Sequence, residues 1–114
     1  MGPVAESQTS KEELESWADE LAERLRAAAD PERADHEKRY LKSELEHYGT
    51  SVPRIRSEVK RLLRERVPKE HGATVAFAEA VWERPVHEMR FAAATALEER
   101  EKLLGPDDLP LLER

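Results

Sequence analysis

The 114-residue chain contains no cysteine, which excludes a disulfide framework, a cysteine-based metal site and a cysteine nucleophile. Aromatic residues make up only 5% of the sequence. The interior must therefore consist mainly of Leu, Val and Ala, a composition that favours helices over a sheet. No apolar run is long enough to cross a membrane, and no signal-peptide pattern opens the chain. We expect a cytoplasmic protein with one domain, as the length suggests.

The charges are unevenly distributed along the chain. The net charge is −6, made up of −6 in residues 1–36, +4 in residues 37–71 and −4 in residues 72–114. A basic centre between two acidic flanks can mark a binding face. A solvated, salt-bridged pair of helices would produce the same pattern, so charge alone leaves both interpretations open.

The basic centre contains the run RYLKSELEHYGTSVPRIRSEVKRLLRER, whose apolar residues recur at helical spacing on both sides of Gly49. Gly49 suits a left-handed helix end, and Pro53 suits the first turn of a following helix. We predict an antiparallel helical hairpin against which every other segment packs. Its buried seam would consist of Leu41, Leu45 and Tyr48 on the first helix and Ile55, Val59, Leu62 and Leu63 on the second.

A polar, patternless stretch over residues 1–10 predicts a disordered lead-in, and residues 11–114 form the predicted helical domain. Ser10 and Glu13 make a capping box, which starts the first helix. The apolar stripe of this helix consists of Leu14, Trp17, Ala18, Leu21 and Leu25.

Five further helices are expected. Asp30 caps the second, with Pro31 at its first position, and this helix should run to about Tyr48. The others are expected at Pro53 to about Arg66, Ala73 to Glu83 and Pro85 to about Leu104, with a short last helix from Asp107 or Asp108. The fourth helix should bury Val75, Phe77, Ala78, Val81 and Trp82, and the fifth Met89, Ala92, Ala93, Ala96 and Leu97.

Short connections between these helices predict an all-α fold, a HEAT-like α-solenoid of stacked antiparallel helix pairs. A closed five- or six-helix bundle would fit the same pattern. Leu109, Leu111 and Leu112 open an apolar helix with no following partner, whereas solenoids normally end in a polar cap. We therefore expect a solenoid truncated at the C-terminus, with a last helix that is available for self-association.

One set of residues suggests binding to nucleic acid. Arg56, Lys60 and Arg64 are spaced i, i+4, i+8, which places them in a single stripe on a helix. Tyr40 and Lys42 lie on the preceding predicted helix. A basic stripe beside an aromatic ring can neutralise phosphates and provide a stacking surface. Such backbone contacts position a protein on DNA without reading its sequence.

Catalytic and metal-binding patterns are absent from the sequence. The four histidines, His36, His47, His71 and His87, show no metal-ligand spacing. There is also no Gly-rich phosphate loop and no Gly-x-Ser-x-Gly elbow. We predict no catalytic residue, no metal site and no cofactor, and the residues give a metal-dependent hydrolase no support.

Two runs carry a family resemblance. RYLKSELEHYGTSVPRIRSEVK resembles the DNA alkylation repair family of the AlkD type, with a Tyr-Leu-Lys-Ser helix, a Gly turn, Pro-x-x-Arg and a Lys four residues further on. AVWERPVHEMRFAAATALEEREKLLGPDDLPLLER resembles a later part of the same family, and together the matches cover roughly residues 31–114. The resemblance implies a HEAT-like α-solenoid. For active members it implies a DNA glycosylase that excises positively charged alkylated purines.

The resemblance also suggests roles for individual residues. Tyr40 falls on the family's cleft tyrosine and Lys42 on the lysine after it, while Arg56 and Lys60 fall on basic positions of the next helix. Arg64 is a looser candidate for the same DNA-binding surface. The Trp-x-x-x-Asp segment that holds the family's catalytic Asp is expected after the stretch LPLLER, and the sequence ends there.

The resemblance therefore implies ancestry in alkylation repair without supplying a catalytic residue. We expect either a fragment of a longer protein or a shortened relative, which binds duplex DNA weakly through backbone contacts and excises no base alone. The alternative is a non-enzymatic helical-repeat interaction module that self-associates through its C-terminal helix.

Overall fold

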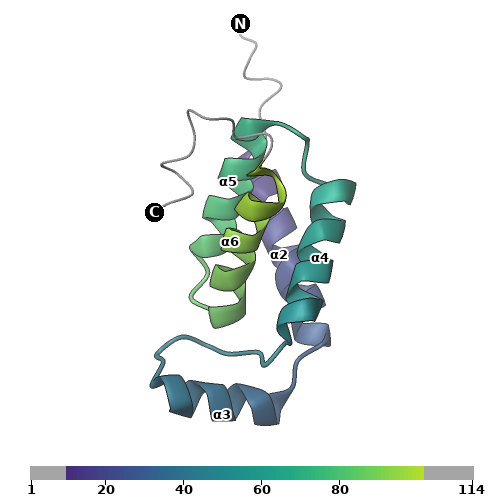
Figure 1. The fold of residues 1–114 in the computed structure, drawn as a ribbon. Helices are drawn as coiled ribbons and strands as arrows, with labels where there is room; N and C mark the ends of the chain where they lie inside the picture. Colours follow the sequence, from purple (N-terminus) through teal and green to yellow (C-terminus); the bar gives the residue numbers. More distant parts are fainter. Residues whose placement is uncertain (1–9, 102–114) are drawn as a thin grey trace, which may run out of the picture.

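A computed structural model describes residues 10–101 of the chain, and every regular element in that range is a helix (Figure 1). The helices are α2 (Lys11–Ala27), α3 (Pro31–Leu41), α4 (Val52–Glu65), α5 (His71–Trp82) and α6 (His87–Glu99). The all-α prediction is confirmed. The predicted lead-in, apart from Ser10, and the predicted last helix lie outside the described residues. Within residues 10–101, no helix has the length and apolar character that a membrane span requires.

Local capping starts the first three helices. Ser10 and Glu13 form the predicted capping box of α2, and the Asp30 side chain accepts hydrogen bonds from two backbone N–H groups of α3. Ser51 accepts from the Arg54 N–H at the start of α4, which has its proline in the first turn as predicted. These caps determine the residue at which each of the three helices begins.

Four helices, α2, α4, α5 and α6, pack together around one hydrophobic core (Figure 1). Trp17 and Phe77 meet edge to face with their ring centroids 6.4 Å apart, a favourable aromatic geometry. Small residues on α6 allow close helix approach. The fully buried core side chains include Leu21, Leu25, Val59, Leu62, Phe77, Val81 and Met89.

The predicted helical hairpin is wrong. α3 ends at Leu41 because Lys42 adopts a left-handed conformation with φ of 52°. The N–H of Lys42 donates to the Arg39 carbonyl and that of Ser43 to the Lys38 carbonyl, a pairing that closes a helix end. α3 buries no residue and crosses beneath the other helices instead of running antiparallel to α4 (Figure 1). Leu41, which was predicted to lie in the buried seam of the hairpin, is exposed.

Tertiary contacts hold residues 42–51 in an extended path. The buried carboxylate of Glu88 accepts hydrogen bonds from the Tyr48 N–H at 2.9 Å and the Gly49 N–H at 3.0 Å. Glu46 forms an isolated parallel bridge with Val86. A longer α3 would have bonded these backbone groups within the helix. They are bonded instead to α6 and to the residues just before it. Gly49 has the predicted positive φ, of 82°, but within this segment and not at a helix end.

Trp82 was predicted to be buried, and this prediction is also wrong. Its side chain is 51% exposed at the end of α5, although the neighbouring residues Phe77, Ala78 and Val81 are buried as predicted. The Arg90 guanidinium lies 4.9 Å from its ring centroid, in a cation–π arrangement. The indole therefore covers part of the surface between α5 and α6 without entering the core.

Candidate nucleic-acid interface

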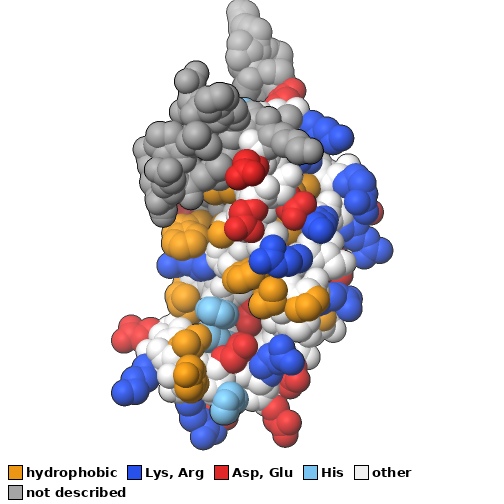
Figure 2. All heavy atoms as spheres, in the orientation of Figure 1, with side chains coloured by type: hydrophobic (Ala, Val, Ile, Leu, Met, Phe, Trp, Pro, Cys, Tyr) orange, Lys and Arg blue, Asp and Glu red, His pale blue; other side chains and the backbone are white. Residues whose placement is uncertain are grey.

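The solvent-facing side of α4 is basic. Because Ile55, Val59 and Leu62 point into the core, the helical period places the cations on the opposite side. Figure 2 shows Lys and Arg side chains gathered over α4. The exposed cations of this helix are Arg54, Arg56, Lys60, Arg61 and Arg64, which we call the α4 basic face.

One edge of the α4 basic face lies against carboxylates of α6. Arg56 is 3.6 Å from Glu98, and Lys60 is 3.9 Å from Glu99. The Arg56 guanidinium also lies 5.5 Å from the centroid of the Phe91 ring. Both ion pairs are substantially solvent-exposed, and such pairs contribute at most about 1 kcal/mol, so a phosphate can compete with either carboxylate.

The other edge of the α4 basic face, formed by Arg54 and Arg61, lies where α4 packs against α2. Glu58 is 4% exposed, and its carboxylate lies 2.9 Å from Arg54, 3.7 Å from Arg61 and 3.7 Å from Arg24. Burial acts to lower the pKa of Arg24, but hydrogen bonds to Glu65 and Glu20 outweigh it and raise that pKa. A buried carboxylate needs these partners, so Arg54 and Arg61 have a structural role that Arg56, Lys60 and Arg64 do not share.

Arg64 continues the stripe one turn beyond Lys60. Among the described residues it makes no ion pair. Its charge is therefore the least compensated of the three cations in the stripe.

The structure separates Tyr40 and Lys42 from this stripe. The Tyr40 side chain is 79% exposed near the end of α3, and Lys42 is the left-handed residue that follows. In Figure 1 the C-terminal end of α3 lies on the opposite side of the molecule from α4. The fold therefore brings together Arg56, Lys60 and Arg64. It places Tyr40, the predicted aromatic partner, on a different part of the surface.

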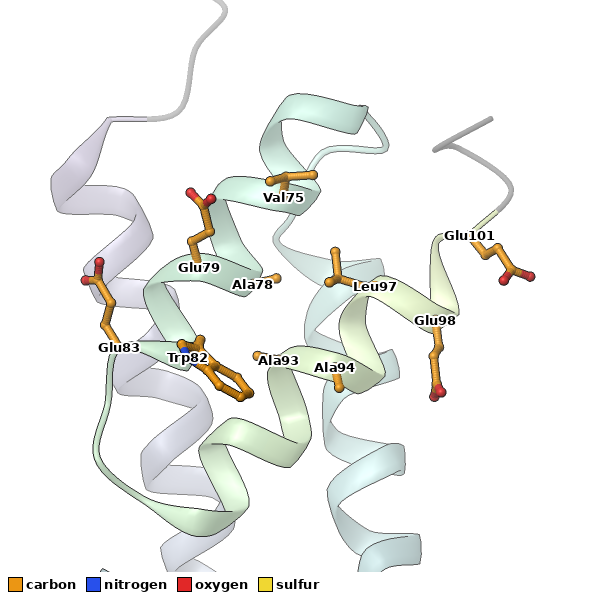
Figure 3. Close-up of a pocket in the computed structure, with 10 residues that line it drawn as sticks. All are labelled: Val75, Ala78, Glu79, Trp82, Glu83, Ala93, Ala94, Leu97, Glu98 and Glu101. Atoms are coloured by element: carbon orange, nitrogen blue, oxygen red, sulfur yellow. The ribbon is translucent and has the colours of Figure 1, made fainter. Parts of the chain in front are cut away.

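A groove between α5 and α6 has the wrong charge for a phosphate backbone. Its floor is apolar, formed by residues such as Ala78, Trp82 and Leu97 (Figure 3). Its rim carries four carboxylates, Glu79, Glu83, Glu98 and Glu101. The carboxylates repel phosphates, so the α4 basic face is the better candidate for contact with nucleic acid.

A cluster of Glu37, His47 and His87 was missed by sequence reasoning. Potential metal-ligand atoms of the three side chains lie within 4.8 Å of one another. The residues come from α3, the following segment and the start of α6, so no spacing along the chain indicates that they meet.

Comparison with known proteins identifies a family. The model of a family described as DNA alkylation repair enzyme matches residues 21–114. No curated protein and no solved structure matches the chain.

Proposed function

Because this chain belongs to the DNA alkylation repair enzyme family, we propose that it acts in the repair of alkylated DNA and contacts the duplex backbone through the α4 basic face. The observation that supports this proposal is the stripe of Arg56, Lys60 and Arg64 on the exposed side of one helix. Successive turns of a helix place these charges about 6 Å apart, close to the spacing of neighbouring phosphates on a strand.

Contacts of this kind supply affinity without base recognition. Lys60 offers a point charge, whereas the guanidinium groups of Arg56 and Arg64 can engage two phosphate oxygens at once. A repair protein must scan many sequences, and contact with the backbone alone permits this. Tyr40 and Lys42 would reach DNA only if it extended to the end of α3.

We further propose that the family chemistry is excision of a cationic alkylated purine within a HEAT-like solenoid. A positively charged base is already a good leaving group, so electrostatic stabilisation of the developing sugar cation can supply most of the catalysis. In the described range, the carboxylates beside the α4 basic face, Glu58, Glu98 and Glu99, are all engaged in ion pairs. Glu58 is held in a buried network, whereas Glu98 and Glu99 would be released only where phosphates displaced them from Arg56 and Lys60.

Removing two cations from the stripe tests the DNA contact. The double substitution Arg56→Gln and Lys60→Gln is expected to weaken binding to a short duplex about tenfold at low salt. It should also reduce the slope of log affinity against log salt by about 2, because two phosphate contacts are lost. Fluorescence anisotropy at several salt concentrations measures both quantities.

Two matched variants complete this experiment. Lys11→Gln with Arg33→Gln removes the same charge from exposed positions on α2 and α3, and is expected to leave the salt slope unchanged. Glu98→Gln with Glu99→Gln removes the competing carboxylates and should strengthen binding. Equal loss of affinity in the α4 double variant and the α2/α3 double variant would mean that net charge, and not the α4 basic face, governs binding.

Single-turnover base release tests the excision chemistry separately. With excess protein, low salt and duplex DNA that carries a methylated purine, we expect release at the spontaneous rate, because Glu58 stays buried in its ion pairs and no residue of the described range is identified as catalytic. Release above that rate would assign the chemistry to a carboxylate of this chain, and substitution of Glu98 and Glu99 in turn would then locate it.

An interaction module is the second candidate function. The apolar floor between α5 and α6, with the half-exposed Trp82, is covered by no other helix of residues 10–101, and a further helix could cover it. Self-association through such a surface would give a mass above that of the monomer in sedimentation. A monomer at high concentration, together with salt-dependent DNA binding, would favour the repair function.

A further inference from the structure

The cluster of Glu37, His47 and His87 lies where three parts of the chain meet. Glu37 is on α3, His47 is in the segment that follows α3, and His87 is the first residue of α6. Backbone hydrogen bonds hold two of these parts in register: the Glu46 N–H donates to the Pro85 carbonyl at 3.1 Å, and the His87 N–H to the Glu46 carbonyl at 2.8 Å. His47 and His87 are therefore fixed side by side by the backbone.

The side chains of the cluster converge. The two imidazole rings are stacked, with centroids 4.5 Å apart and an angle of 7° between their planes. Nδ1 of His47 is 3.7 Å from Oε1 of Glu37, and potential ligand atoms of all three residues lie within 4.8 Å of one another. Two nitrogens and one oxygen thus lie within 4.8 Å of one another.

Three polar atoms of this cluster lack hydrogen-bond partners. The His47 side chain is only 1% exposed, yet neither of its ring nitrogens has a hydrogen-bond partner. Oε1 of Glu37 is buried and also lacks a hydrogen bond. Burying polar atoms without a hydrogen-bond partner is unfavourable, so such groups in a native protein normally have a partner. A ligand bound between the three side chains would supply one.

We propose that Glu37, His47 and His87 bind one divalent metal ion of the zinc class. Two imidazole nitrogens with one carboxylate oxygen are typical zinc ligands, and they leave a fourth position for water. Hard cations such as Mg²⁺ prefer oxygen ligands only, so the two histidines disfavour them. Tetrahedral bonds of about 2.0–2.1 Å place ligands about 3.3 Å apart, so metal binding requires the stacked rings to rotate out of their parallel arrangement until both nitrogens point at one ion.

The metal would have a structural consequence for α3. This helix buries no residue of its own, so hydrophobic packing does little to fix it on the rest of the protein. A metal bound by Glu37 and His87 would join α3 directly to α6. Binding to the folded state alone also raises its stability. The site therefore acts as a clamp for α3, independent of any role in DNA repair.

The test is a titration of the untagged, metal-free chain with Zn²⁺ by calorimetry and with Co²⁺ by absorption spectroscopy. We expect one ion per chain, visible-range bands of a low-symmetry Co²⁺ site, a rise in Tm with Zn²⁺ and slower proteolysis within α3. Glu37→Gln is the mildest ligand change because this side chain is one-third exposed. It and His87→Gln should each weaken binding by more than about tenfold.

His36→Gln is the matched control, since His36 is an exposed histidine on α3 outside the cluster. It should bind Zn²⁺ with unchanged affinity and stoichiometry. Circular dichroism checks that each variant remains helical. Unchanged Zn²⁺ affinity in Glu37→Gln and His87→Gln, or a Tm that Zn²⁺ does not raise, would overturn the proposal, leaving a hydrogen-bonded His47–Glu37 pair or a bound water in its place.

Discussion

Replacing Arg100 by methionine is expected to lower the free energy of unfolding by about 3 kcal/mol. The Arg100 side chain is buried where α6 ends, and its guanidinium donates hydrogen bonds to four oxygens. Three of these are carbonyls at or just after the end of α4, and the fourth is a hydroxyl on α5. The acceptors are Leu63 O at 2.5 Å, Val67 O at 2.9 Å, Pro68 O at 2.8 Å and Thr74 Oγ1 at 3.1 Å.

The size of this effect follows from what the substitution leaves behind. Methionine fills much of the same volume but donates no hydrogen bond, so buried carbonyls at the end of α4 lose their partner. A cation is also favoured at a helix C-terminus by the helix dipole. Burial lowers the pKa of the Arg100 guanidinium, but an arginine remains cationic across the accessible pH range.

Urea unfolding followed by circular dichroism measures this prediction. Arg66→Met is the matched control, because Arg66 is an exposed arginine at the end of α4 whose ion pair with Glu20 spans 3.3 Å. We expect it to cost at most about 1 kcal/mol. Arg100→Lys should fall between the two, since an ammonium cannot reach all four acceptors. Similar losses for Arg100→Met and Arg66→Met would show that this buried network does not hold the α4–α5 connection.

Replacing Gly49 by alanine should be at least as damaging. A Cβ at this position would lie 2.1 Å from the Asp30 carbonyl oxygen and 2.8 Å from the Ala34 backbone nitrogen, and both are backbone atoms that cannot rotate away. The φ of +82° adds a conformational cost of about 1 kcal/mol or more for any residue with a side chain. We expect a loss of about 3 kcal/mol or more, with α3 displaced from its place beside Gly49.

Gly72→Ala provides an internal comparison for this variant. A Cβ at Gly72 meets no atom within 4 Å, and the residue lies in the first turn of α5. Alanine is the better helix former by up to about 1 kcal/mol, so this variant should be neutral or slightly more stable. Thermal unfolding of both variants measures the difference. A Gly49→Ala protein as stable as Gly72→Ala would mean that the close approach of Gly49 to α3 is not required by the fold.

The candidate site was partly predictable for a simple reason. Arg56, Lys60 and Arg64 lie on one helix, and the helical period alone places them on one side. The predicted positions of Tyr40 and Lys42 beside α4 depended on a second helix and on how the two helices pack. This packing differs from the prediction. Their position relative to α4 therefore could not be predicted from a sequence pattern.

The amino-acid sequence by itself determined the helical class, the starts of α2, α3 and α4, the apolar faces of α2 and α4, and the family. Each of these depends on interactions within one or two helical turns, as with Ser10 and Glu13, or on a run of residues read in order. Only the tertiary structure decided the end of α3 at Leu41, the exposure of Trp82 and the meeting of His47 with His87. These features depend on partners distant along the chain, such as Glu88, which bonds backbone groups 40 and 39 residues away. Those long-range hydrogen bonds outweigh the local helical preference of residues 42–48.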